Sequence, residues 1–565
     1  MADATTAPGL LDRERIIATA GFNRWMVPPA ALAIHLCIGM AYGFSVFWKP
    51  LQAALVGADG KPLPECSAGA VTFSEKAAGT LKALTATDCN WSQFDLGWMY
   101  TFFFVLLGVS AAIWGGWLER AGPRKAGVVA ALCWCGGLLI SALGVFWHQL
   151  WMLWVGSGII GGIGLGLGYI SPVSTLIKWF PDRRGMATGM AIMGFGGGAM
   201  IGSPLATLLM NQFKTVNEAG LVIEPGVWQT FIAMALIYIC FMMIGAFNYR
   251  LPPSGWKPEG WTPPAATNAM ITSKNVHLKN AHKTPQFWLL WTVLCMNVSA
   301  GIGIIGNASN MLQDTFGGAL IGKPGVGFAD LKSDPALLAA AAAVGAGFVG
   351  LVSLFNIFGR ITWASSSDKL GRKVTYFIFF TLGAALYVLA AFGAEWQSLA
   401  IFIASIAIIA SMYGGGFATI PAYLADIFGT QFVGAIHGRL LTAWSTAGIV
   451  GPVIVNYLYD MRKASGVPLD QIYGPIFYVL AGLLAVGFLA NLLVRPVDPK
   501  WHMTDAEIAE ERAKLHEKAA PVTSGDYGIG RGGLDAKAIP FWLLVGIPLA
   551  WGVWVTIQKS VGLFV

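Results

Sequence analysis

The chain has 565 residues, of which 56% are apolar and 12% are charged. Soluble domains carry about 25% charged residues, so this composition excludes a soluble globular protein and places most of the chain in a lipid bilayer. The formal net charge is +7, and the uneven distribution of Lys and Arg described below makes it a signal of membrane orientation rather than of nucleic-acid binding.

Thirteen apolar runs are long enough to cross a bilayer, which takes about 20 helical residues. Because the runs are continuous and do not alternate, they predict helices rather than barrel strands. The runs cover residues 27–48, 95–118, 127–146, 151–172, 187–210, 228–249, 286–311, 338–362, 374–393, 398–422, 434–458, 474–494 and 540–562.

The Lys and Arg residues predict which ends of the spans face the cytoplasm. With segment 1–26 inside, the inside segments hold 24 of these residues and the outside segments hold 10. We therefore expect a multi-pass protein of the inner (plasma) membrane, with a cytoplasmic N-terminus and an external C-terminus. Segment 1–26 is charged and lacks an apolar core, so we expect no cleavable signal peptide.

A duplicated unit organises the first twelve spans, because similar residues recur at a fixed offset of 249 positions. The pairs are Glu119 with Asp368, Gly122 with Gly371, Pro172 with Pro421, Gly185 with Gly434, Gly189 with Gly438, and Phe195 with Trp444. Internal duplication in an apolar chain is typical of secondary transporters. We expect two six-helix halves, residues 27–250 and 286–494, joined by a cytoplasmic linker at 251–285.

Four segments lie outside this duplication. Long external loops at 49–93 and 313–337 follow the first span of each half, and we expect them to form a small external cap. A cytoplasmic segment at 495–539 contains a surface helix, which opens with Thr504 and Glu507 at the spacing of a capping box. The last run, 540–562, is expected to be an accessory transmembrane helix.

The seven cysteines predict one possible disulfide. Cys66 and Cys89 both lie in the first external loop, where the compartment permits a disulfide bond. The other five fall in spans and are expected to be small core residues. No metal-ligand cluster, nucleophile–base pair or cofactor loop is present in the sequence, so we expect no cofactor, no metal and no enzymatic activity.

Three loops and one helix resemble a known family. The strings GGWLERAGPRKAG and SSSDKLGRKVTY resemble the signature loop of the major facilitator superfamily, the second with Ala364 in place of the first glycine. KWFPDRRGMATG and LFNIFGRITW resemble the fourth loop and the arginine-bearing eighth helix of the oxalate/formate antiporter family and its monocarboxylate-carrier relatives. The resemblance covers residues 24–495. It implies an all-α membrane protein with the major facilitator fold, here with a thirteenth C-terminal helix.

The charged residues of the two loops predict a latch. An acidic side chain at the inner end of one helix can bind a basic cluster and a neighbouring helix end, which would stabilise one closed state of two rocking halves. Positive-inside anchoring alone would explain the basic residues but not the acidic ones. The predicted latch residues are Glu119, Arg124, Lys125, Asp368, Arg372 and Lys373.

Arg360 is the strongest candidate for the substrate site. An arginine inside a span costs at least about 2.5–3.5 kcal/mol and indicates function. Snorkelling to the cytoplasmic face is the alternative, but eight residues separate Arg360 from Asp368, about 12 Å at helical rise. A guanidinium binds carboxylate through two parallel donors, and the resemblance implies this role. Asn356 is expected to orient it, and Ala111 is its counterpart in the first repeat.

The resemblance also implies a second cation, a lysine in helix eleven of oxalate-transporting members, but Trp444 occupies that position. Tryptophan offers one N–H donor and no charge. Arg360 alone would neutralise a monoanion and leave a dianion with one uncompensated charge. We therefore expect formate, pyruvate, lactate or similar monocarboxylates rather than oxalate. Arg439 could supply a second charge, but snorkelling or a place on the exit path is the preferred interpretation.

Aromatic residues from helices one, four, ten and eleven are expected to wall the cavity, with Trp444 in helix eleven. The resemblance implies that Tyr42, Tyr413 and Phe417 match aromatic cage positions of the family, and that Tyr169 lies in the corresponding part of helix four. Each of these residues, taken alone, is more often a packing residue than a ligand.

The absence of an acidic partner predicts the transport mode. No Asp or Glu lies near the middle of any span, so an empty carrier would bury Arg360 unpaired, which is costly. We therefore expect anion exchange by alternating access, in a chain that functions as a monomer. His35 is the protonatable group expected near mid-membrane and leaves proton symport open, although a neutral, hydrogen-bonded histidine is the simpler interpretation. A carboxylate sensor is a further alternative, but the soluble parts are too short for a signalling domain.

Overall fold

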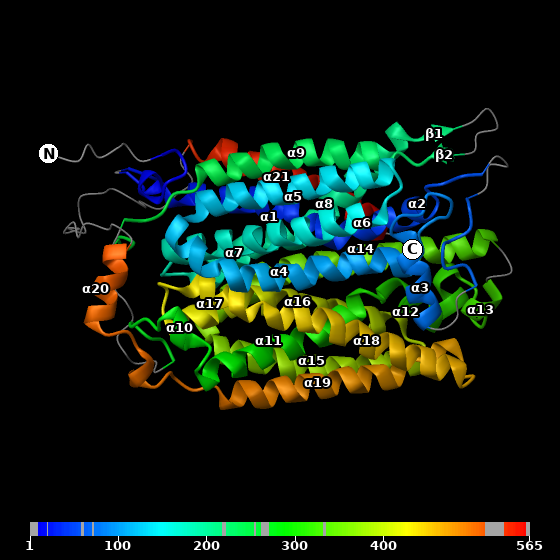
Figure 1. Ribbon diagram of the computed structural model, residues 1–565. Coiled ribbons are helices and arrows are strands. Elements are labelled where there is room, and N and C mark those ends of the chain that lie inside the picture. Colours follow the sequence, from blue (N-terminus) through cyan, green and yellow to red (C-terminus); the bar gives the residue numbers. More distant parts are fainter. Residues whose placement is uncertain are drawn as a thin grey trace.

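The computed structural model describes residues 9–19, 21–57, 62–69, 73–216, 222–253, 256–261, 270–331, 335–514 and 536–560. Among these residues, thirteen helical segments are long and apolar enough to cross a membrane, which confirms the predicted number of spans. The spans run side by side along one common direction (Figure 1). We call the end that carries α10 (Leu278–Ala281) and α20 (Asp505–Lys514) the linker end.

The described part of the N-terminal half contains six spans. They are α1 (Val27–Ile38) continued by η3 (Gly39–Phe47), α4 (Gln93–Ala121), α5 (Pro123–Phe146), α6 (Leu150–Leu153) continued by η4 (Trp154–Gly161) and α7 (Gly162–Trp179), α8 (Arg184–Phe213), and α9 (Val227–Asn248). The fourth span passes through a π-helical stretch at η4 and ends at Trp179, beyond the predicted end at residue 172. Short 3-10 turns, η1 (Arg13–Ile16) and η2 (Arg24–Met26), precede this half.

The described part of the C-terminal half also contains six spans. They are α11 (Pro285–Ile305), α14 (Pro335–Leu370), α15 (Arg372–Glu395), α16 (Leu399–Phe428), α17 (Val433–Leu440) followed by α18 (Thr442–Ala464), and α19 (Tyr473–Leu493). The seventh span was expected to reach residue 311. It ends at Ile305, because the helix-breaking pair Gly306–Asn307 separates it from α12 (Ala308–Phe316).

Small elements cover the opposite end of the bundle, on the right of Figure 1. They are α2 (Trp48–Gln52), α3 (Phe73–Ala83), the antiparallel hairpin of β1 (Thr215–Val216) and β2 (Val222–Glu224), α12, η5 (Gly317–Ile321) and α13 (Phe328–Leu331). A disulfide joins Cys66 and Cys89 here, and we call this end the disulfide end. Both long loops therefore contain short helices rather than irregular chain.

The two signature loops have the same local structure. Gly122 ends α4 and Gly371 ends α14, each with φ of 86°. This backbone region is accessible to glycine at little cost and strained for other residues, so the repeated glycine redirects the chain into the next helix in both halves. At the linker end, Thr504 and Glu507 form the predicted capping box at the start of α20, after the turn η7 (Pro499–Trp501). The turn η6 (Leu469–Gln471) joins α18 to α19 and packs against α12 at the disulfide end.

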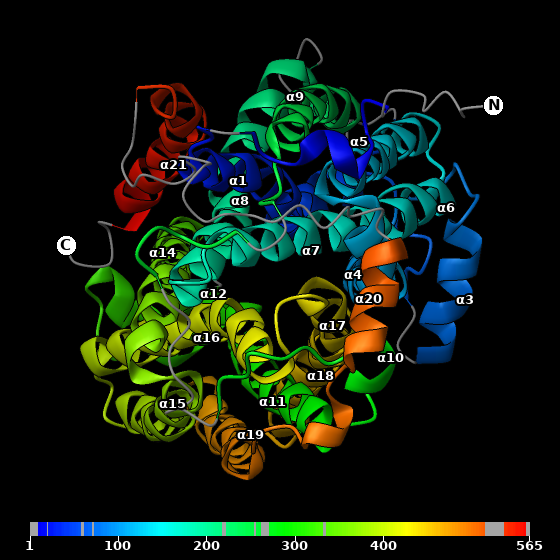
Figure 2. The same ribbon diagram turned by 90° about the vertical axis from the view of Figure 1, so that its left-hand side faces the viewer.

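The two halves face each other across the centre of the molecule, as the view from the linker end shows (Figure 2). At their interface, α4 packs against α17 and α18, and α8 packs against α14 and α16. The thirteenth span, α21 (Ile539–Ser560), packs at the periphery against α1, α8 and α14. It therefore contacts both halves, and Trp542 at its start donates from Nε1 to the carbonyl of Trp25 at 3.1 Å.

Candidate functional site

The two acidic residues of the duplicated loops join the halves crosswise at the linker end. Asp368 of α14 accepts hydrogen bonds from the backbone N–H groups of Gly185 and Met186, at 2.8 and 2.9 Å. Glu119 of α4 accepts one from the N–H of Gly434 at 3.2 Å. These N–H groups belong to the first turns of α8 and α17, which have no partners within their own helices and carry positive partial charge. Each half therefore caps a helix of the other.

Further charged groups extend both caps. Lys178 lies 2.5 Å from Glu119. Arg372 binds Asp368 at 2.6 Å and Asp426 at 3.1 Å, and Arg184 of the opposite half binds Asp426 at 2.8 Å. These ion pairs are partly or fully buried, so salt screens them less than surface pairs.

Three predicted latch residues lie elsewhere. Arg124 donates to the carbonyls of Leu10 and Phe247, and Lys373 donates to those of Leu492 and Val494. Lys125 is exposed. Arg124 and Lys373 therefore bind chain segments of their own half, because the ends of α9 and α19 present free carbonyl groups beside them.

Glycines allow the helices of the two halves to touch. A Cβ on Gly185 would lie 2.0 Å from the carbonyl oxygen of Ala364, and one on Gly189 would lie 2.6 Å from that of Arg360. In the other repeat, a Cβ on Gly438 would lie 2.3 Å from the carbonyl oxygen of Ala111. Small residues of this kind let helix backbones approach closely, so the repeated glycines mark the interface between the halves.

We expect Asp368→Asn to open the linker end. The amide keeps one acceptor oxygen but loses the charge, and a hydrogen bond to a charged group contributes about 1.5–3 kcal/mol. A cysteine at Ala435, which is buried against Gly115, should then react with maleimide about tenfold faster in detergent, after the five free cysteines are replaced by serine. Asp498→Asn is the control, because this exposed acid pairs only with Lys500 of its own segment among the described ion pairs. Unchanged labelling would contradict the latch.

Arg360 is fully buried between the halves. Its Nε donates to Oδ1 of Asn356 at 2.9 Å, and its Nη1 donates to the carbonyl of Ile192 in α8 at 3.0 Å. The guanidinium also lies over the Phe417 ring, 5.6 Å from its centroid. A Cβ on Gly196 would lie 3.0 Å from the Arg360 Nε, so glycine at this position lets the guanidinium rest against α8. The side chain does not snorkel.

Aromatic rings surround Trp444, and we call this group, with Arg360 and Tyr413, the cage. The rings nearest Trp444 belong to Phe417 at 4.5 Å, Tyr169 at 5.4 Å, Phe195 at 5.5 Å, Phe104 at 5.6 Å and Tyr42 at 6.1 Å between centroids. Tyr413 packs edge-on against Phe417 at 5.2 Å. The five aromatic residues expected from the sequence therefore meet, and Phe104 and Phe195 join them.

Phe195 and Phe104 were missed as cage residues. Phe195 is the counterpart of Trp444 in the first repeat, and this offset was a usable signal. Phe104 carries no comparable signal, because its contact with Trp444 depends on how α4 is rotated against α18.

The cage holds several buried donor atoms that have no hydrogen-bond partner in the described part of the chain. They are Nη2 of Arg360, the hydroxyl of Tyr169 and Nε1 of Trp444, while the hydroxyl of Tyr42 interacts with Tyr413 and with Arg360. A buried polar group left unpaired costs about 1–3 kcal/mol. These donors, on and around one positively charged side chain, are suited to a small anion with several acceptor oxygens.

His35 lies beside this cage between two backbone carbonyls. Its Nδ1 is 2.5 Å from the oxygen of Ala191, and its Nε2 is 3.1 Å from that of Tyr169. A neutral imidazole donates from one nitrogen only, so a neutral His35 donates to one of these carbonyls, and binding of a proton would let it donate to both. The carbonyl bound by His35 and the one bound by Arg360 belong to neighbouring residues of α8, Ala191 and Ile192.

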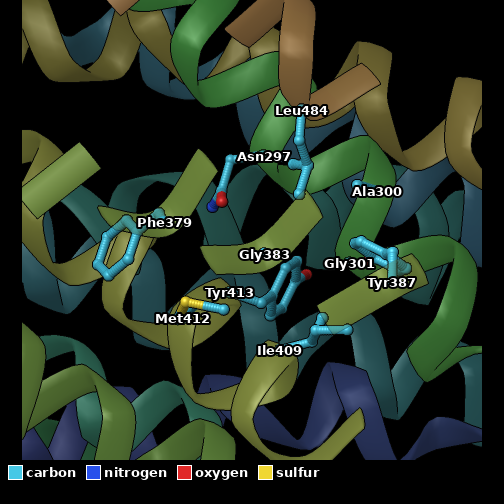
Figure 3. A pocket seen from close by; sticks show the side chains of 10 residues that line it. All are labelled: Asn297, Ala300, Gly301, Phe379, Gly383, Tyr387, Ile409, Met412, Tyr413 and Leu484. Atoms are coloured by element: carbon cyan, nitrogen blue, oxygen red, sulfur yellow. The ribbon is translucent and has the colours of Figure 1, made fainter. Parts of the chain in front are cut away.

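A separate small pocket lies inside the C-terminal half, between α11, α15, α16 and α19 (Figure 3). It is lined by Asn297, Ala300, Gly301, Phe379, Gly383, Tyr387, Ile409, Met412, Tyr413 and Leu484. Only Tyr413 belongs to both the pocket and the cage. None of the residues that line this pocket is charged, and all of them belong to the C-terminal half. The cage therefore remains the stronger candidate site.

Comparison with known sequences adds a family match to this geometry. The pattern of the Major Facilitator Superfamily matches residues 66–354 and 330–564. The oxalate:formate antiporter of Oxalobacter formigenes is 30% identical over 293 residues, which are 52% of this chain and 59% of that protein. Apicoplast pyruvate carrier 1 of Toxoplasma gondii is 24% identical over 470 residues, covering 72% of this chain and 78% of the carrier.

Solved structures with the same fold cover most of the chain. The human organic anion transporter MFSD10 matches with a TM-score of 0.53 and 14% identity, over 83% of this chain and 99% of that one. The proton:xylose symporter XylE matches with a TM-score of 0.51 and 17% identity, over 83% and 94%. At these identities the likeness shows the fold alone, and it confirms the all-helical fold expected from the sequence.

Proposed function

This chain belongs to the Major Facilitator Superfamily, and from that premise we propose that it exchanges small monocarboxylates across a membrane by alternating access. The family is one of membrane transporters and not of enzymes. The observation that carries the proposal is the buried Arg360, whose Nη2 has no hydrogen-bond partner among the described residues and lies in a donor-rich cage between the halves.

The cage favours a carboxylate for three reasons. The guanidinium supplies a positive charge and two-pronged donor geometry. The free hydroxyl and indole donors can complete the coordination of carboxylate oxygens. The aromatic rings can contact a short apolar substituent. The names of two relatives, one an oxalate:formate antiporter and the other a pyruvate carrier, support the same substrate class.

A single negative charge fits better than two. Trp444 brings an aromatic ring rather than a cation to the centre of the cage, and Arg439 is directed away from it. The Arg439 Nη1 lies 2.6 Å from the carbonyl oxygen of Leu278 and 2.8 Å from Nδ1 of His282. We therefore favour formate, pyruvate, lactate or a similar acid over oxalate.

The crosswise caps of Glu119 and Asp368 support a rocking mechanism. They hold the halves together at the linker end, so release of both caps would open the cage on that side. The excess of Lys and Arg near the linker end supports an orientation in which this end faces the cytoplasm, in a protein of the plasma membrane. Each chain carries one complete cage, which supports function as a monomer.

If the protein is an obligatory exchanger, we expect uptake into vesicles to depend on substrate inside them. Proteoliposomes preloaded with pyruvate should take up labelled pyruvate at least about 100-fold faster than empty ones, because burying an uncompensated charge costs about 3–5 kcal/mol. Protein-free liposomes loaded in the same way give the background. Strong uptake into empty vesicles driven by a proton gradient would instead support the second candidate, proton symport, which the two carbonyl contacts of His35 favour. Binding without uptake under either condition would support a sensor.

A further inference from the structure

A second buried histidine lies beside the cage and has no assigned role. His437 of α17 is fully buried, and neither of its ring nitrogens has a hydrogen-bond partner among the described residues. Its ring lies 5.9 Å from the ring of Tyr169, whose other neighbours include Trp444 at 5.4 Å and His35 at 5.3 Å. His437 is therefore next to the cage, on the side of the linker end.

The unpartnered nitrogens distinguish His437 from His35. Both nitrogens of His35 face main-chain oxygens at hydrogen-bond distance. Within the part of the chain that the structure describes, His437 has no such acceptor, although burial without a partner is costly for a polar ring. A ligand that carries acceptor oxygens would give this ring a partner. His437 also belongs to the same span as Trp444, and Trp444 itself brings no charge to the cage.

The buried and half-buried acidic and basic groups on the elements packed against α17 are already engaged, and Arg120 of α4 and Lys279 of α10 are exposed. Glu119 of α4 and Lys178 of α7 bind each other, Asp426 of α16 binds two arginines, and Arg439 binds Leu278 and His282 of the α10 region. Across the cage, Arg360 and His35 bind α8 carbonyls, and Tyr169 contributes only a neutral hydroxyl. Neither α11 nor the part of α18 before Asp460 contains a charged residue.

Building on the proposed function, we propose that His437 is a protonatable specificity residue that sets the charge of the accepted substrate. Neutral His437 leaves Arg360 as the only cation, and the site takes a monocarboxylate. Protonated His437 adds a second positive charge in helix eleven, so the site takes a dicarboxylate such as oxalate together with one proton. The bound dianion in turn favours the protonated ring, because opposite charges attract strongly in a site shielded from water.

The proposal predicts a pH-dependent preference. Because oxalate is taken together with one proton and pyruvate is not, lowering the pH from about 8 to about 6 favours oxalate. Oxalate and pyruvate are both fully ionised across this range. The ratio of oxalate to pyruvate counterflow in proteoliposomes should therefore rise about tenfold between these two pH values in the parent protein.

Variants distinguish His437 from the other histidines. His437→Gln should keep pyruvate counterflow and give a low ratio at both pH values, whereas His437→Lys should give a high ratio at both. His282→Gln is the matched control at the linker end and should behave like the parent. A flat ratio in the parent, or an unchanged rise in His437→Gln, would overturn the proposal. A rise that is lost only in His35→Gln would assign the charge to His35 and overturn it as well.

The same assay separates this inference from the proposed function. Absence of pyruvate counterflow in the parent at both pH values would refute carboxylate exchange itself. Intact pyruvate counterflow with a pH-independent ratio would refute only the role of His437. If His437→Gln does not fold, as judged by size-exclusion chromatography, the pH-independence expected of His437→Lys still decides the matter.

Discussion

Replacement of Arg360 by Gln is expected to reduce pyruvate counterflow in proteoliposomes at least about 100-fold. The substitution removes the only charged group of the cage and the free Nη2 donor. Loss of one partner of a desolvated, hydrogen-bonded charge pair costs about 2–5 kcal/mol in binding, and each 1.4 kcal/mol corresponds to about a factor of ten. Initial rates at substrate concentrations below KM measure the effect.

Two further variants separate charge from geometry and from general damage. Arg360→Lys keeps the positive charge but loses the planar fork, so we expect an intermediate loss of about tenfold. Arg439→Gln is the matched control, because this arginine of helix eleven binds Leu278 and His282 outside the cage. It should retain counterflow within about threefold, given that its hydrogen bonds are part-buried and peripheral. Full activity of Arg360→Gln would place the substrate site elsewhere.

The surroundings of Arg360 refine the argument for exchange. The empty closed protein does not leave the guanidinium without partners, because Asn356 and the Ile192 carbonyl accept two of its hydrogen bonds. These acceptors are neutral, so the charge itself stays uncompensated in the closed state. The cost of returning empty is therefore mainly electrostatic rather than a loss of hydrogen bonds, and a bound anion removes it.

The sequence was sufficient to predict the helical scaffold and to single out the buried arginine, Arg360. Continuous apolar runs predicted thirteen spans, and the fixed offset predicted a duplication. Members of two different offset pairs contact each other crosswise between the halves: Asp368 caps the helix at Gly185, and Glu119 caps the helix at Gly434. Arg360 could be singled out because an arginine in an apolar run has few explanations other than function.

The sequence could not show how each helix is rotated or which distant residues meet. Phe104 contacts Trp444 although 340 positions separate them, and His437 reaches Tyr169 in the same way. Gly196 is needed because the Arg360 guanidinium rests against it, and no local sequence pattern reveals this contact. Arg124 and Lys373 have the right spacing for the latch, but free carbonyls at the nearby ends of α9 and α19 bind them instead. Tertiary packing decides each of these points.

Trp444→Lys is expected to change the preferred substrate from pyruvate to oxalate. The indole of Trp444 lies at the centre of the cage, 4.5 Å from the ring of Phe417, over which the Arg360 guanidinium is placed. An ammonium group here would face the second carboxylate of a dianion bound to Arg360. Two opposite charges about 5 Å apart attract by about 3 kcal/mol at an effective dielectric constant near 20. We therefore expect the ratio of oxalate to pyruvate counterflow to rise at least about tenfold at neutral pH.

The empty variant would bury two cations, so the same change should destabilise it. Thermal unfolding in detergent should occur at a lower temperature than in the parent, and oxalate should restore more of the loss than pyruvate, since a ligand that binds only the folded state stabilises it. Trp444→Phe is the matched control: it keeps an aromatic ring, loses the Nε1 donor and adds no charge, so it should retain the preference for pyruvate. A parent protein that already prefers oxalate at neutral pH would refute the charge argument. A lysine variant that folds and still prefers pyruvate would show that cage shape, rather than the number of positive charges, selects the substrate.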